Sequence, residues 1–201
     1  MCGIFGCVLN EGNAAPLVRE GLKRLEYRGY DSVGVATVWD GRVFVKKDVG
    51  KLDEVHAKLN LDDLPGCVGI GHTRWATHGA PEQVNAHPHT DCTGEVAVVH
   101  NGIVENFVEL KRMLEQRGHV FRSRCDTEVI AHLIEDELKK AGSLVEAVRR
   151  ALREVRGSYA IAVVHAKHPD RIVCARLESP LVIGLSSRGM YCSSDIPSFL
   201  H

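Results

Sequence analysis

The order of apolar patterns along the chain constrains its fold more than any other feature. Short runs of the strand type come first, a block of helical patterns occupies the middle, and strand-type runs return near the end. A parallel α/β protein would instead alternate strands and helices. The order therefore predicts a layered α+β protein with largely antiparallel sheets.

The strand predictions rest on short apolar runs rich in β-branched residues and bounded by turn residues. They cover Gly3–Leu9, Ser32–Val38, Val43–Lys47, Gly66–Thr73, Glu95–His100, Tyr159–Val164, Arg171–Ala175, Leu181–Leu185 and Met190–Cys192. The pair Asp40-Gly41 separates the second run from the third. This dipeptide suits a tight hairpin turn that requires positive φ, so the two runs are predicted to pair.

The helix predictions rest on apolar residues that recur every three or four positions. They cover Ala14–Glu26, Asn106–Arg117, a segment that begins at Asp126 or Thr127 and ends at Gly142, and a segment that begins at Ser143 and ends before Gly157. Glycines at the ends of these patterns and the Ser143-x-x-Glu146 capping box mark the boundaries.

Composition narrows the class of protein. A chain of 201 residues suffices for one domain with a full core. The formal net charge of -1 gives no excess of positive charge of the kind that binds nucleic acid or an anionic membrane. No secretory signal and no apolar span of about 20 residues is present, so we expect a cytoplasmic protein without a membrane partner.

Neither cysteines nor histidines form a known metal motif in the sequence. The seven cysteines include no C-x-x-C pair, which predicts free thiols rather than structural zinc or redox chemistry. Several histidines lie on or beside predicted loops, namely His72, His78, His87, His89 and His100. None has H-E-x-x-H spacing, so we expect them to bond loops or to pack, with no metal and no other cofactor.

Cys2 lies directly behind Met1, and a small second residue is what removal of the initiator methionine requires. Removal would give one residue both a nucleophilic thiol and a free α-amine, which titrates near pH ~7.7–8.0 against ~8.5 for the thiol. Terminal-threonine hydrolases use such an amine as general base. The alternative is a buried cysteine at the start of a strand.

Three further places can carry chemistry. Arg74 has the planar fork that binds a carboxylate, although it could also lie along Trp75. The Asn101-Gly102 pair can donate two hydrogen bonds to an oxyanion, although Asn-Gly is also a common turn. Asp126 can hold a substrate ammonium, or it can cap the following helix.

Six motifs occur in order: Met1-Cys2-Gly3-Ile4, YRGYDS at 27–32, GHTRWATHG at 71–79, NAHPH at 85–89, HNGIVEN at 100–106 and DTE at 126–128. In this combination the chain resembles, over nearly its whole length, the glutaminase domains of the glucosamine-6-phosphate synthase family. These belong to the class II amidotransferases with N-terminal nucleophiles. Cys125 departs from the pattern, since the family often has Thr at that position.

The resemblance implies a role for each matching residue. Cys2 would attack the side-chain amide of L-glutamine, and Asn101 and Gly102 would stabilise the oxyanion. The other roles concern substrate binding. Arg74 and Thr77 would bind the substrate carboxylate, Asp126 its ammonium, Trp75 and His78 would belong to a closing loop, and Arg28 would order the pocket.

The resemblance also implies a four-layer αββα sandwich and one glutaminase domain over residues 1–201. Sugar-isomerase domains that bind fructose 6-phosphate would be partners outside this chain, in an enzyme expected to be a homo-oligomer. Three alternatives remain open: the glutaminase domain of another class II enzyme such as an amidophosphoribosyltransferase, a non-catalytic amino-acid-binding module, and a metal-dependent amidohydrolase.

Overall fold

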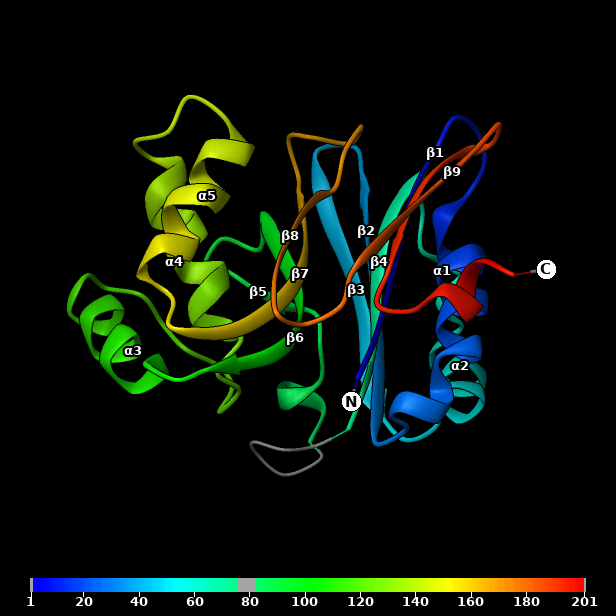
Figure 1. The fold of residues 1–201 in the computed structure, drawn as a ribbon, viewed down its shortest axis with the longest axis horizontal. Coiled ribbons are helices and arrows are strands. Elements are labelled where there is room, and N and C mark those ends of the chain that lie inside the picture. The colour runs from blue at the N-terminus through cyan, green and yellow to red at the C-terminus, as the bar shows by residue number, and fades with distance from the viewer. Residues whose placement is uncertain (1, 76–81, 201) are drawn as a thin grey trace.

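The computed structural model describes residues 2–75 and 82–200, and its elements form four layers in the order helices, sheet, sheet, helices (Figure 1). Sheet A is antiparallel with the spatial order β3 (Arg42–Val49), β2 (Ser32–Trp39), β4 (Val68–Arg74), β1 (Gly3–Leu9), β10 (Gly189–Ser193), β9 (Val182–Ser186). Sheet B is antiparallel with the order β5 (His89–Thr90), β6 (Val96–Val104), β7 (Gly157–His165), β8 (Val173–Leu177). The predicted α+β sandwich is confirmed.

Helices close the sandwich on both sides. Sheet A is covered by α1 (Ala14–Arg24) and α2 (Leu52–Leu59), whereas sheet B is covered by α3 (Phe107–Gln116), α4 (Glu128–Leu138) and α5 (Leu144–Glu154) (Figure 1). Each boundary between layers has its own apolar core. A chain of this length therefore buries both faces of both sheets.

Strand β6 shows how the sequence produces this layering. Val96 and Val98 pack into the core under α3–α5, whereas Ala97 and Val99 pack into the core between the two sheets. Successive side chains of a strand point to opposite faces, so an unbroken apolar run fits a strand that is buried on both sides.

The predicted hairpin forms between β2 and β3. Trp39 pairs with Arg42, and the two turn residues Asp40 and Gly41 both have positive φ, at 48° and 68°. Two positive values at the centre of a two-residue loop define the type I′ turn, whose twist matches that of the strands.

The element predictions failed in a few places. Helix α2 was not predicted, since only Leu52 and Val55 of its eight residues are buried and its pattern is correspondingly short. Helix α1 ends at Arg24 and a 3-10 turn follows over Glu26–Arg28. The two-residue strand β5 is too short to leave a pattern in the sequence.

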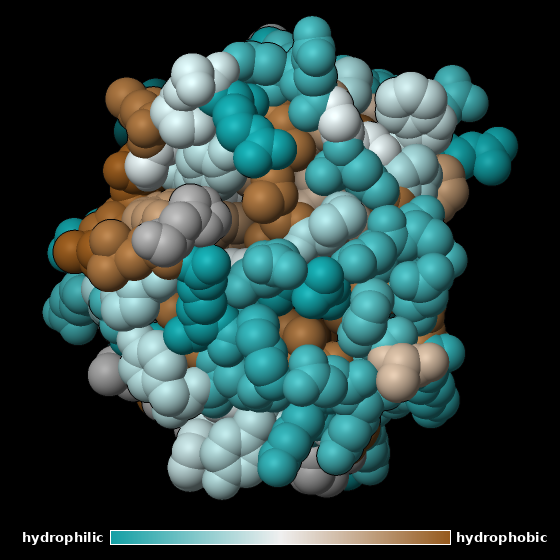
Figure 2. All heavy atoms as spheres, turned by 90° about the vertical axis from the view of Figure 1, so that its right-hand side faces the viewer, coloured by the Kyte–Doolittle hydropathy of each residue, from teal (hydrophilic) through white to brown (hydrophobic). Residues whose placement is uncertain are grey.

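The outer surface over α1 and α2 is mostly hydrophilic, with apolar side chains gathered towards one edge (Figure 2). The edge strand β9 exposes Ile183 and Leu185, by 61% and 77%. Among residues 2–75 and 82–200, no helix combines the length and apolar character that a membrane span requires.

Candidate active site

Cys2 directly precedes β1, which lies in the middle of sheet A. The neighbouring strand β4 ends beside it and is followed by Trp75. Gly3 pairs with Thr73, and this register brings the Trp75 backbone N–H within 3.2 Å of the Cys2 Sγ, to which it donates. Cys2 is half-buried, whereas Cys7 on the same strand is completely buried in the core. Cys2 is therefore not the fully buried cysteine of the alternative interpretation.

The surroundings of the thiol act on it in opposite directions. Burial raises the pKa of Cys2, while the hydrogen bond from Trp75 N–H and the positive charges of Arg74 and Arg28 lower it. Burial is the largest of these effects, so the group is a protonated thiol at neutral pH. A nucleophilic role would therefore require a base that removes this proton.

Arg28 is buried beside Cys2 at the end of the 3-10 turn that follows α1. Its Nε donates to the Cys2 carbonyl oxygen at 3.1 Å, and its Nη1 bonds Asp195 Oδ2 at 2.7 Å. Tyr27 donates to the same carboxylate oxygen at 2.6 Å. Asp195 thus fixes Arg28, and the sequence analysis missed it because no motif surrounds it and 167 residues separate the pair.

Asn101 and Gly102 lie within β6, so the turn interpretation of this pair is wrong. The Asn101 amide Nδ2 donates to the Cys2 carbonyl oxygen at 2.9 Å. His72 Nε2 lies 3.0 Å from Asn101 Oδ1 and 3.1 Å from the His100 carbonyl oxygen. Both of these oxygens accept, so Nε2 carries the proton and sets which end of the amide points to Cys2.

Gly102 has a φ of +134°, a backbone conformation that residues other than glycine rarely adopt. A Cβ built there would lie 2.0 Å from the Ser158 carbonyl oxygen. Glycine is therefore required at this position for β6 and β7 to pair as they do.

Arg74 and Asp126 come from different parts of the fold and act on a common neighbour. Arg74 ends β4 and is buried. Burial and the charge of Asp126 raise the pKa of the Cys125 thiol to about 11, against the opposing charge of Arg74. One basic and one acidic side chain thus both act on the Cys125 thiol.

Asp126 does not cap α4, so that alternative is wrong. Its Oδ2 accepts from the Val104 backbone N–H at 2.8 Å, and α4 begins two residues later at Glu128. The carboxylate is buried at the end of β6.

The predicted closing loop is described only at its start. The Trp75 side chain is 46% exposed and its ring meets Tyr30 edge-on, with centroids 5.6 Å apart. Thr77 and His78 lie outside the described residues.

Four of the five histidines noted in the sequence, His72, His87, His89 and His100, are buried close to one another. The rings of His72 and His87 lie 4.1 Å apart, and His87 and His100 both bond the Thr127 hydroxyl, at 2.8 and 2.9 Å. Burial lowers the pKa of His72 to about 3 and holds the pKa values of His87 and His89 well below their ordinary range. These rings are packed and neutral, as the sequence analysis expected.

Comparison with known proteins agrees with this arrangement. A family model described as a glutamine amidotransferase domain matches residues 72–201. Two glutamine-fructose-6-phosphate aminotransferases (isomerizing) align along the whole chain. That of Pyrococcus horikoshii is 58% identical and that of Methanothermobacter thermautotrophicus 57% identical. The chain spans 33% and 34% of the length of these relatives.

Solved structures show the same fold. The glutamine phosphoribosylpyrophosphate amidotransferase of B. subtilis, in complex with ADP and GMP, superposes with a TM-score of 0.82 at 29% identity, over 98% of this chain and 43% of that one. A second structure, described as the allosteric regulatory enzyme of purine biosynthesis, gives a TM-score of 0.83 at 30% identity over the same shares. With its matching family model, its relatives and its fold, this chain belongs to the glutamine amidotransferase domain family.

Proposed function

We propose that the chain hydrolyses L-glutamine to L-glutamate and ammonia through a thioester on Cys2. The observation that carries this proposal is the setting of the half-buried Cys2: its thiol accepts from Trp75 N–H, and its carbonyl oxygen accepts from Arg28 and Asn101. This combination supplies a nucleophile, positive charge and an uncharged amide donor within one small volume.

The reaction would proceed in two steps. Removal of Met1 frees the α-amine of Cys2, which takes the thiol proton as Sγ attacks the carbon of the glutamine side-chain amide. The Asn101 amide and the Gly102 N–H stabilise the negative oxygen, and the C–N bond then breaks as the amine returns the proton to the departing ammonia. Water hydrolyses the thioester and releases glutamate, which splits one difficult amide hydrolysis into two easier reactions.

Substrate binding would use groups of opposite charge. Arg74, together with Thr77, would bind the α-carboxylate through charge-assisted hydrogen bonds, and Asp126 would bind the α-ammonium. Asp126 Oδ2 accepts from Val104 N–H, so the ammonium would bind at Oδ1, in place of the long contact of 3.6 Å that Oδ1 makes with the Cys125 thiol. Trp75 and His78 would belong to the loop that closes over the substrate.

In the whole enzyme the ammonia would pass to fructose 6-phosphate and yield glucosamine 6-phosphate. The support is the name of the relatives, which are 57–58% identical to this chain and about three times as long. Residues 1–201 would be the glutaminase domain, and sugar-isomerase domains would form the remainder of a cytoplasmic homo-oligomer.

The proposal is tested by measuring glutamate release from glutamine with the purified protein and with Cys2→Ala. The wild type should turn over, and Cys2→Ala should show no enzymatic rate. Cys67→Ala is the matched control, because Cys67 is also half-buried but lies at the opposite end of β4 from Trp75, with its thiol near the Pro169 carbonyl oxygen. Turnover by Cys2→Ala at the wild-type rate would refute the assignment.

Glucosamine 6-phosphate formation separates the domain from the whole enzyme. When fructose 6-phosphate is added to the 201-residue protein, we expect ammonia and glutamate but no amino sugar. Amino sugar production by this chain alone would contradict the proposed division of labour.

A further inference from the structure

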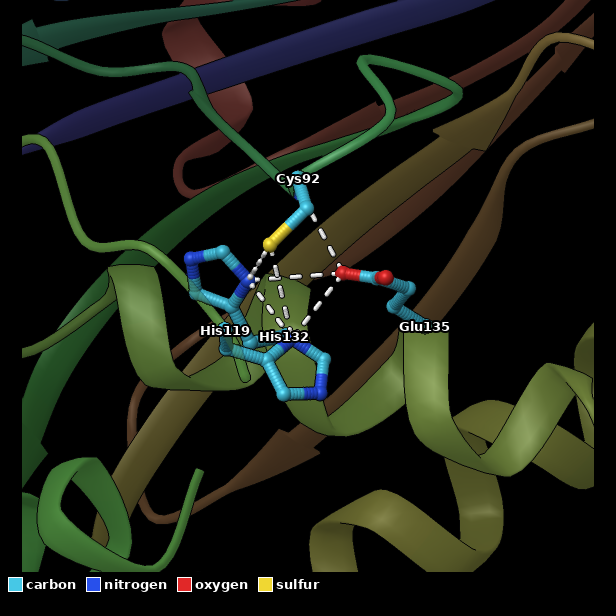
Figure 3. A group of neighbouring side chains, drawn as sticks. All are labelled: Cys92, His119, His132 and Glu135. Carbon is cyan, nitrogen blue, oxygen red and sulfur yellow. Dashed lines mark hydrogen bonds and ion pairs between the residues drawn. The ribbon is translucent and has the colours of Figure 1, made fainter. Parts of the chain in front are cut away.

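A second cluster of reactive side chains lies in the helical layer of sheet B, away from Cys2 on sheet A. It comprises Cys92 from the turn between β5 and β6, His119 from the segment after α3, and His132 and Glu135 from α4 (Figure 3). The four ligand atoms lie within 4.8 Å of one another. The proposed glutaminase reaction uses none of these residues.

The spacing of the ligand atoms is that of a tetrahedron. The Cys92 Sγ lies 3.6 Å from His119 Nδ1 and 3.5 Å from His132 Nδ1. The two Nδ1 atoms are 3.2 Å apart, and they lie 3.1 and 3.4 Å from Glu135 Oε2. Zinc bonds of about 2.0–2.1 Å to nitrogen and about 2.3 Å to sulfur give tetrahedral edges of about 3.3–3.4 Å for N to N and about 3.5–3.6 Å for N to S.

Hydrogen bonds alone do not account for these contacts. His119 Nε2 lies 2.9 Å from Asp136 Oδ1, and a carboxylate only accepts, so the proton of the neutral ring is on Nε2. His119 Nδ1 therefore presents a lone pair to the centre of the cluster. At most two protons, that of the Cys92 thiol and the ring proton of His132, can serve the five contacts among these atoms, so the other contacts bring lone pairs together.

His132 is oriented in the same way. Its Nε2 faces the Glu128 carboxylate at 3.7 Å, and its Nδ1 points to the centre. The side chain is 1% exposed, and the Phe121 ring packs 4.4 Å from it. Two buried imidazoles thus present Nδ1 to one point. The carboxylate of Asp136 accepts from the outer nitrogen of His119, which is the usual arrangement around a zinc-bound histidine, whereas His132 Nε2 is too far from Glu128 for a hydrogen bond.

The charges and the backbone also fit a divalent cation. A Cys92 thiolate and the Glu135 carboxylate carry two negative charges, which would balance Zn²⁺. The Val120 backbone N–H points at the Cys92 Sγ at 3.4 Å, as suits a thiolate. The Cys92 backbone N–H donates to Glu135 Oε2 at 3.1 Å and so orients that ligand.

We propose that Cys92, His119, His132 and Glu135 bind one Zn²⁺ ion in a structural site that ties the β5–β6 turn and the end of α3 to α4. Four protein ligands leave no open position for substrate, which is typical of structural rather than catalytic zinc. The mixture of thiolate, imidazole and carboxylate favours zinc over the harder magnesium and calcium ions. This site replaces the sequence-based expectation that the protein holds no metal.

A second group of potential ligands, His87, His89 and Cys125, fits zinc less well. His87 Nε2 bonds the Thr127 hydroxyl at 2.8 Å, and it lies 4.0 Å from the Cys125 Sγ, longer than a zinc tetrahedron allows. The group has only three members. It serves below as an internal comparison.

The test is metal content by mass spectrometry after exposure to Zn²⁺ and removal of loosely bound ions. We expect about one zinc per chain in the wild type and in the controls Cys67→Ser and Cys125→Ser. Cys92→Ser and Glu135→Gln should lose it, and Asp136→Ala should bind about 10–100-fold more weakly because it removes the acceptor that orients His119. Glu135→Gln keeps an acceptor for Cys92 N–H, so it carries the test if Cys92→Ser does not fold.

Cobalt supplies a second readout that does not depend on activity. Co²⁺-loaded protein should show the intense visible bands of a tetrahedral site and a thiolate-to-cobalt absorption that Cys92→Ser lacks. If the wild-type protein holds no more zinc than Cys92→Ser, the proposal is overturned. The four ligand atoms would then be held together by shared protons. Loss of zinc from Cys125→Ser, with Cys92→Ser still loaded, would overturn it in favour of the second group.

Discussion

Asn101 is held by contacts to both sheets. His72 on β4 of sheet A donates to its side-chain oxygen, so its nitrogen is directed at Cys2. Burial lowers the pKa of His72 to about 3, so the ring keeps a single proton throughout the physiological range. An uncharged donor fixed in this way needs no reorganisation when negative charge develops on the substrate oxygen.

Asn101→Ala should therefore lower kcat for glutamine hydrolysis by roughly 10²–10³ while the protein remains folded. The reason is the loss of one donor to the oxyanion. Steady-state kinetics and circular dichroism provide the measurement, and Asn10→Ala, an exposed asparagine after β1, is the matched control. A kcat for Asn101→Ala equal to that of the control would remove Asn101 from the mechanism.

At the scale of the element, β6 combines packing and chemistry along one strand. Its first residues fill two cores with alternating side chains, and its last residues present Asn101 and Gly102 beside Cys2. The close approach of Gly102 to Ser158 on β7 is part of the same strand pairing. The glycine to which the proposed mechanism assigns an oxyanion donor is thus also required for the pairing of β6 with β7.

Gly102→Ala should lower the free energy of unfolding by more than the left-handed backbone alone would cause. Placing a residue with a Cβ at positive φ costs about 1–2 kcal/mol. The added Cβ would lie 2.0 Å from a backbone oxygen that cannot move without parting β6 from β7. Gly12→Ala is the control, because Gly12 has a φ of +93° with open space around it. Urea unfolding of both variants measures the difference, and equal losses would show that β6 and β7 adjust without cost.

Element prediction from the sequence succeeded where the apolar pattern was long or the turn chemistry specific. Strands buried on both faces left continuous apolar runs, and Asp40-Gly41 gave its hairpin. Helix α2 was not predicted, because it buries only two side chains and so leaves only a short apolar pattern in the sequence. The motif residues Cys2, Asn101 and Asp126 could be identified by resemblance, but Asp195 and the Cys92 cluster depend on contacts between distant segments that no local pattern records.

At the scale of the whole molecule, the core holds a cluster of buried histidines. His72, His87, His89 and His100 are buried, and burial lowers the pKa of each. The unfolded chain would bind protons at these sites near pH ~6.5, whereas the folded protein does not. Stability is therefore fully present above that pH and falls as the pH drops towards the folded pKa values.

Between about pH 7.5 and about pH 5.5, His72 alone should accordingly lower the free energy of unfolding by about 1.4 kcal/mol, and the other three histidines should add to this fall. Urea unfolding at the two pH values measures the total. His72→Gln should reduce the pH dependence by one such increment, since it removes one site that is protonated only in the unfolded chain. A variant with an undiminished pH dependence would show that His72 takes up its proton in the folded state.

Labelling with a glutamine analogue that carries a reactive ketone tests the proposed nucleophile most directly. Intact mass and peptide mapping should show a single adduct on the terminal peptide, at Cys2 with Met1 removed, and excess glutamine should prevent it. Cys125, the buried thiol beside Asp126, should stay unlabelled. An adduct on Cys125 or another thiol, with the terminal peptide unmodified in an active protein, would contradict the account.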